Sequence, residues 1–173
     1  MSQKLTILVA PSNEAGHINA CVGLSIPFKA RGHRVIFVLP ETWRGKVTSH
    51  GFEEHIHQID STSPTDPNEH PGAHYAKILH QYKMLGPYSS LEKLQSVRNI
   101  LESEHHANEI MQNDAAVKEA IELYKPDVVF VDSLWLPPSI YYSKIPWVKS
   151  LAMSPILMVW DDNIPPGGSG KFL

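Results

Sequence analysis

The chain has 173 residues, of which 42% are hydrophobic and 19% are charged, a balance that excludes general disorder. Its formal net charge of −3 at pH 7 and the lack of a basic run argue against nucleic acid as a partner. The single cysteine, Cys21, excludes an internal disulfide framework and a cysteine-based zinc cluster.

The first apolar run, residues 4–10, is typical of a strand that is buried on both faces in a parallel sheet. Its apolar part, Leu5 to Ala10, is shorter than the roughly 7–15 residues of a signal peptide's apolar region. No stretch of the chain approaches the roughly 18 apolar residues that cross a bilayer. We therefore expect a cytoplasmic protein with no membrane partner.

A segment with helical spacing follows, and the residues that share one face of it are Ile18, Cys21, Val22 and Ser25. Gly32 is suited to end this helix as its C′ residue. Pro27 lies inside it, so we expect a kink there or a short first segment. The next apolar run, 34–39, predicts a second buried strand and completes a βαβ unit.

The middle of the chain predicts an edge strand and then helices. Residues 53–59 predict a third strand, and its acidic start favours a position towards an edge. Residues 60–72 contain three prolines and predict an exposed loop. From residue 73 to about 123 we expect two or three helices, broken at Gly86-Pro87 and near Asn113-Asp114.

The last part of the chain predicts two more strands, at residues 127–132 and 147–151. Asp132 and Ser133 could cap a short segment between them. Strands that alternate with helices, without a repeat of fixed period, predict an α/β fold: a Rossmann-like, doubly wound parallel sheet. We expect the fourth strand to lie beside the first.

Two polar segments fall at the carboxyl ends of these strands, where doubly wound sheets bind ligands. Residues 13–17 follow the first strand and residues 132–135 follow the fourth, so His17 and Asp132 should meet. A carboxylate that accepts from Nδ1–H fixes the histidine tautomer, and Nε2 can then take a proton from a hydroxyl. The sequence contains no Gly-x-Ser-x-Gly motif that would indicate a hydrolase.

Three segments carry a family resemblance: Val9-Ala10-Pro11 with Gly16-His17-Ile18-Asn19, Arg31-Gly32-His33-Arg34-Val35, and Lys125-Pro126-Asp127-Val128-Val129 with Asp132. In this order they resemble family 1 UDP-glycosyltransferases, closest to the bacterial macrolide-type and arthropod branches. The tail, Ser154-Pro155 and Asp162 to Pro166, is also similar to the end of the acceptor side of these enzymes.

The resemblance implies the amino-terminal half of a GT-B enzyme, with His17 as the base that activates the acceptor and Asp132 as the residue that orients it. Residues 1–160 would form the Rossmann-like acceptor-binding domain and residues 161–173 a loop or flexible tail. Nothing in the chain resembles the donor-binding domain. We therefore expect the chain alone to be inactive and to bind no cofactor, with a UDP-sugar as co-substrate of the complete enzyme and a small lipophilic acceptor as partner.

Candidate acceptor-binding residues lie near the predicted strand ends and in the helical region: Gly16, Ile18, Tyr82, Met84, Leu85, Trp135 and Leu136. Core packing is the alternative for each apolar side chain. Trp135 is the best candidate because it follows Asp132. Gly16 would serve a tight turn and the close approach of a ligand to the backbone.

Other interpretations remain open. The pairs His55/His57 and His70/His74 lack a third ligand of fitting spacing, so we predict no metal. The chain could be a non-enzymatic module, derived from such an enzyme, that binds a small ligand. A flavodoxin-like domain is disfavoured because no Gly-rich or Ser/Thr-rich phosphate loop follows the first strand. His17 could also be a structural residue at a helix start.

Overall fold

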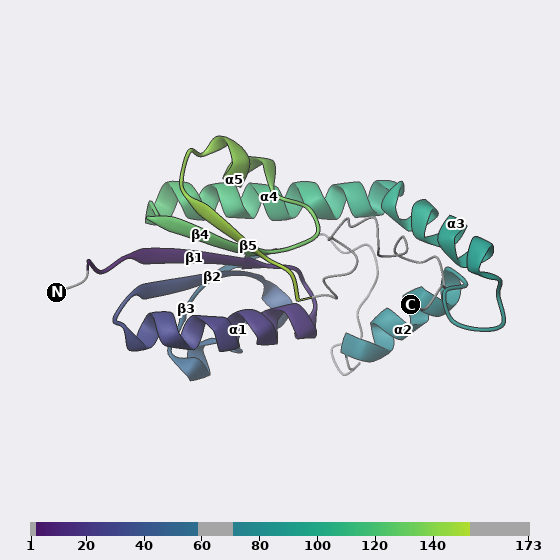
Figure 1. Ribbon diagram of the computed structural model, residues 1–173, viewed down its shortest axis with the longest axis horizontal. Coiled ribbons are helices and arrows are strands. Elements are labelled where there is room, and N and C mark those ends of the chain that lie inside the picture. The colour runs from purple at the N-terminus through teal and green to yellow at the C-terminus, as the bar shows by residue number, and fades with distance from the viewer. Residues whose placement is uncertain (1–2, 59–70, 153–173) are drawn as a thin grey trace, which may run out of the picture. The chain divides into compact units, whose positions relative to one another are not determined.

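The computed structural model describes residues 3–58 and 71–152, and the chain divides into two compact units. The first unit comprises residues 1–60 and 109–152, and the second comprises residues 61–108 and 153–173. A parallel β-sheet organises the first unit (Figure 1). Its strands are β1 (Thr6–Pro11), β2 (Arg34–Pro40), β3 (Glu53–His57), β4 (Val128–Asp132) and β5 (Trp147–Ser150).

The strand order is β3-β2-β1-β4-β5, and every neighbouring pair is parallel. The central strand is β1, where Ile7 pairs with Val35 of β2 and with Val128 of β4. The predicted α/β, Rossmann-like doubly wound fold is therefore confirmed. The fourth strand lies beside the first, and β3 lies at an edge, both as expected.

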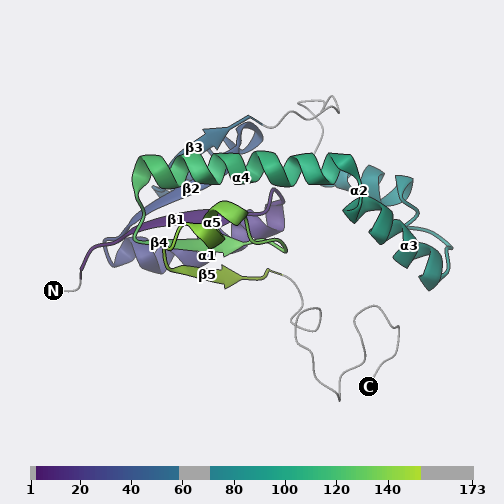
Figure 2. The same cartoon turned by 90° about the horizontal axis from the view of Figure 1, so that it is seen from above.

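Helices cover both faces of this sheet, with α1 (Ala15–Ala30) on one side and α4 (Glu104–Tyr124) on the other (Figures 1 and 2). The short helix α5 (Pro138–Tyr142) lies on the α4 side. Ile7 and Val9 of β1 belong to the core on the α1 side, and Leu8 belongs to the core on the α4 side. Successive side chains of a strand point to opposite faces, so the continuous apolar run of β1 follows from burial on both faces.

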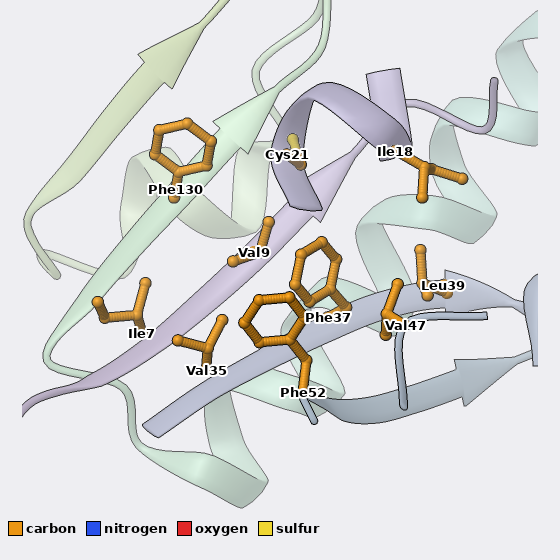
Figure 3. Close-up of a cluster of buried hydrophobic side chains, with 10 residues drawn as sticks. All are labelled: Ile7, Val9, Ile18, Cys21, Val35, Phe37, Leu39, Val47, Phe52 and Phe130. Carbon is orange, nitrogen blue, oxygen red and sulfur yellow. The ribbon is translucent and has the colours of Figure 1, made fainter. Parts of the chain in front are cut away.

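The core on the α1 side is rich in aromatic residues (Figure 3). Phe37 is fully buried, and its ring centroid lies 5.2 Å from that of Phe52. Burial of one such side chain stabilises the fold by about 1.5–3 kcal/mol. The buried members of this cluster are Ile7, Val9, Ile18, Cys21, Val35, Phe37, Leu39, Val47, Phe52 and Phe130.

Helix α1 runs unbroken past Pro27 to Ala30, so the short first segment expected from the sequence is wrong. Proline has no N–H to donate to the preceding turn. The last turn is nevertheless closed, since Arg31 N–H donates to the Pro27 carbonyl at 3.1 Å. Gly32 follows with φ +82°, as predicted for the C′ residue.

Helix α4 also continues through Asn113 and Asp114, so the helix break predicted there is wrong. The interruption lies between α3 (Ser90–Leu101) and Glu104, where α4 begins. Asp114 has a tertiary role instead: its Oδ1 accepts from Ser139 N–H at 2.8 Å, and its Oδ2 accepts from Ser139 Oγ at 3.0 Å. A side chain of α4 thus binds the first turn of α5.

The cap predicted for the segment after β4 is found for Ser133, whose Oγ accepts from Trp135 N–H at 3.3 Å, and not for Asp132. Helix α5 begins at Pro138 after Pro137, and no side chain of its N-cap residue makes a capping bond. Asp132 remains in β4 as its last residue. Its carboxylate is therefore available for contacts with α1.

The second unit is helical within the described residues and contains α2 (Pro71–Gln81), α3 and the start of α4. A capping box begins α3, in which Glu92 N–H donates to Ser89 Oγ at 3.3 Å and Ser89 N–H donates to Glu92 Oε2 at 2.8 Å. None of the described helices combines the length and apolarity of a membrane span. The predicted tail at 161–173 and the family-like segment from Ser154 lie outside the described residues.

Candidate active site

The carboxyl ends of β1 and β4 form the base of the site. Pro11 of β1 pairs in register with Asp132 of β4, and Ser12 N–H donates to the Asp132 carbonyl at 2.7 Å. Helix α1 then starts at Ala15. This short connection brings the first turn of α1 over the end of β4, at the position where doubly wound sheets bind ligands.

His17 and Asp132 are in direct contact there. His17 Nδ1 lies 3.1 Å from Asp132 Oδ2, and the exposed fraction of the side chain is 16% for His17 and 0% for Asp132. An ionised carboxylate only accepts hydrogen bonds, so in the neutral imidazole Nδ1 carries the proton and Nε2 a lone pair. The arrangement predicted from the sequence is present, and it leaves a basic nitrogen on a partly exposed ring.

The buried carboxylate of Asp132 has two further partners. Its Oδ1 accepts from Ala152 N–H at 2.9 Å. Its Oδ2, which already faces His17, lies 3.8 Å from Cys21 Sγ, within reach of a thiol hydrogen bond. Burial of a charge costs free energy unless the charge is paired and hydrogen-bonded. These contacts give both oxygens of the Asp132 carboxylate a hydrogen-bond donor.

The electrostatic environment keeps the thiol protonated. Burial, followed by the negative charge of Asp132 and the hydrogen bond to it, raises the pKa of the Cys21 thiol to about 12. Loss of hydration also raises the pKa of Glu14, with His17 opposing the shift and Glu109 and Asp132 adding to it. At neutral pH Cys21 is therefore a donor towards Asp132.

Two of the acceptor candidates lie in α1 beside His17. Gly16 is helical, without a left-handed φ, and a Cβ added to it would meet no atom within 4 Å. The tight-turn role predicted for Gly16 is therefore wrong. The space next to its Cα is open, so the approach of a ligand to the backbone there stays a prediction. Ile18 is only 2% exposed and belongs to the core, so its side chain packs against the sheet instead of lining a pocket.

The two candidates after β4 differ in exposure. Trp135 is 50% exposed, and its backbone N–H donates to Ser133 Oγ at 3.3 Å. Leu136 is partly buried and packs against the core on the α4 side. Lys149 Nζ donates to the Leu134 carbonyl at 3.0 Å and ties this loop to β5. Trp135 is thus the exposed apolar side chain that the sequence placed near Asp132.

The remaining candidates, Tyr82, Met84 and Leu85, belong to the second unit. They follow α2, where the N–H groups of Met84 and Leu85 donate to the Leu79 carbonyl at 2.8 and 3.4 Å. Leu85 is 46% exposed. Their contact with an acceptor stays a prediction.

The sequence analysis missed two contacts at this site. Cys21 stands four positions after His17, a spacing that places both on one helix face and could have indicated a shared partner. Trp43 Nε1 donates to Asn13 Oδ1 at 2.8 Å and links the 3₁₀ helix Glu41–Trp43 to the loop after β1. No sequence pattern indicates that second contact.

Among the residues that the structure describes, no group of three or more His, Cys, Asp or Glu side chains is arranged to hold a metal ion, and His70 of the pair His70/His74 lies outside those residues. His55 is buried, and its ring meets Tyr124 edge-on at 5.6 Å between centroids. His57 Nδ1 lies 3.3 Å from the Gln58 carbonyl oxygen.

No protein-family model and no curated protein sequence matches the chain, but solved structures resemble it. SsfS6, a glycosyltransferase from Streptomyces sp. SF2575, is 20% identical with a TM-score of 0.55, over 85% of this chain and 39% of its own. The glycosyltransferase of kitacinnamycin is 18% identical with a TM-score of 0.56, over 87% of this chain and 31% of its own. The glycosyltransferase SnogD from Streptomyces nogalater is 17% identical with a TM-score of 0.51, over 87% and 35%.

These similarities establish the fold. The chain has the Rossmann-like α/β architecture of known glycosyltransferases and spans well under half of their length, between 31% and 39%.

Proposed function

We propose that this chain is the acceptor-binding part of an inverting glycosyltransferase, in which His17 is the general base and Asp132 orients it. The observation that carries the proposal is the 3.1 Å contact between His17 Nδ1 and Asp132 Oδ2 at the carboxyl ends of adjacent parallel strands. The glycosyltransferase fold of the structural neighbours supports the reaction class.

The chemistry follows from the tautomer. Nε2 of His17 takes the proton of an acceptor hydroxyl, and the acceptor oxygen forms a bond to the anomeric carbon of the sugar. The bond from that carbon to the nucleoside diphosphate breaks, and its electron pair leaves with the diphosphate. Attack from the opposite side inverts the anomeric centre. Asp132 stabilises the imidazolium that forms on His17.

The donor and the acceptor follow from separate arguments. A small lipophilic acceptor would find an exposed apolar side chain in Trp135, which follows Asp132 by three positions and is half-exposed. A UDP-sugar is the donor that the family resemblance implies. SsfS6 was crystallised with thymidine diphosphate, so UDP- and dTDP-sugars are both to be assayed.

The first prediction tests the base in the complete product of the gene that encodes this chain. His17→Ala should lower turnover on hydroxyl acceptors about 10²–10⁴-fold, the usual contribution of a positioned general base. Asp132→Asn should also reduce the rate strongly, because an amide can hold the imidazole in the wrong tautomer. Steady-state sugar transfer measures both effects.

His57→Ala is the matched control, since His57 also ends a parallel strand but has a backbone carbonyl as its partner. It should leave turnover near that of the unchanged protein. Near-normal transfer by His17→Ala would contradict the proposal. Tight acceptor binding without transfer from any donor would favour the non-enzymatic binding module.

A further inference from the structure

We infer that Cys21 is a positioning residue that holds the Asp132 carboxylate for His17. The inference rests on the proposed function, because it assigns a second residue of α1 to the same site.

The geometry places the thiol at the same oxygen as the imidazole. His17 and Cys21 stand one helical turn apart, and both reach Oδ2 of Asp132, at 3.1 and 3.8 Å. Cys21 and Asp132 are each fully buried, and Cys21 lies within the core cluster that contains Val9 and Phe130 (Figure 3). Water is therefore not an alternative donor to this oxygen from the α1 side.

Three donors then define the orientation of the carboxylate: Ala152 N–H on Oδ1, and His17 Nδ1–H and Cys21 S–H on Oδ2. During sugar transfer His17 becomes an imidazolium, so its hydrogen bond to Asp132 changes from a neutral donor to a charged one. The charge of the other two donors does not change. The thiol remains protonated at neutral pH because its pKa is raised to about 12. Cys21 therefore limits the movement of Oδ2 throughout the reaction.

The thiol also acts on the basicity of His17. A donor to a carboxylate withdraws part of its negative charge, so its removal strengthens the attraction between Asp132 and the imidazolium. The titration midpoint of His17 should then rise. Glu14 is a further titratable group that interacts electrostatically with His17, and Glu109 acts on Glu14 in turn, so Glu14→Gln serves as a charge control.

The first measurement is an NMR titration of the His17 ring in the 173-residue chain. Cys21→Ala should raise its midpoint, whereas Cys21→Ser, which keeps a donor, should stay near the unchanged chain. Ser25→Ala is the matched control: Ser25 is fully buried one turn further along the same face of α1, and its change should leave the midpoint unaltered. Glu14→Gln should lower the midpoint, which shows that the probe responds to local charge.

The second measurement is kinetic and uses the complete gene product. Cys21→Ala should lower kcat about threefold to tenfold with little change in KM for the acceptor, as expected for one weak hydrogen bond to a catalytic group. Cys21→Ser should recover most of the loss. If Cys21→Ala does not fold, Cys21→Val, which fills the volume without a donor, replaces it.

The outcomes separate the two hypotheses. A Cys21→Ala protein with an unchanged His17 midpoint and unchanged kcat would overturn this inference alone, provided that His17→Ala is inactive. Full activity of His17→Ala would overturn the proposed function and the inference with it. Equal losses in Cys21→Ala and Cys21→Ser would indicate core packing and would also overturn the positioning role.

Discussion

The two faces of the sheet are built from different side chains. The α1 face holds the aromatic residues Phe37, Phe52 and Phe130, together with the buried polar groups of α1, whereas the α4 face is closed by small residues such as Ala116 and Ala120. Small residues let a helix lie close to the strands. The face that carries the candidate site is thus the one with the larger aromatic side chains, and polar groups are buried on both faces, as His55 against Tyr124 shows on the α4 side.

The largest effect on stability should come from the aromatic core of the α1 face. Phe37→Ala should reduce the free energy of unfolding by about 3–5 kcal/mol, because it removes a fully buried ring and leaves a cavity. Urea denaturation followed by circular dichroism measures the loss. Val38→Ala, the next residue on the opposite face, removes fewer carbon atoms and should cost less. Equal losses in the free energy of unfolding for Phe37→Ala and Val38→Ala would mean that the aromatic core of the α1 face contributes no more to stability than the α4 face.

The α4 face should respond to added volume. Ala120 is fully buried against the strands, so Ala120→Leu should lower the free energy of unfolding by about 1–3 kcal/mol through overpacking. Ala115, on the exposed side of the same helix, is the control, and Ala115→Leu should change stability by less than about 0.5 kcal/mol. Equal effects of the two substitutions in urea denaturation would contradict the idea that buried alanines let α4 pack closely against the strands.

The smallest effect should be a gain on the α1 face. Ser25 is fully buried, and its hydroxyl has no hydrogen-bond partner among the described residues. Ser25→Ala removes an unsatisfied group and substitutes a better helix former, so thermal unfolding should show a protein that is equally stable or up to about 1 kcal/mol more stable. Ser96→Ala is the contrast, because Ser96 Oγ donates to the Glu92 carbonyl at 3.0 Å, and it should lose stability. A loss above about 1 kcal/mol in Ser25→Ala would show that the hydroxyl has a partner.

Two of the elements that sequence patterns misplaced depend on long-range contacts. Asn113-Asp114 reads as a helix break because both residues favour turns, yet Asp114 bonds Ser139 of α5 and α4 continues. Asp132 reads as a helix cap, but its carboxylate bonds His17 and Ala152 instead. In both cases a short acidic side chain found its partner far along the chain, where local propensity carries no information.

The sequence by itself determined the parallel sheet, its strand order and the meeting of His17 with Asp132. Buried strands are continuous apolar runs, and the carboxyl ends of adjacent parallel strands meet at one edge. Only the tertiary structure decided that Ile18 packs into the core, that Cys21 reaches the same carboxylate oxygen as His17, and that Ala152 N–H completes the set. The physical reason is that the hydrogen-bond donors to a buried carboxylate come from α1 and from the residues after β5. These segments are far apart in the sequence, and only tertiary packing brings them to the same carboxylate.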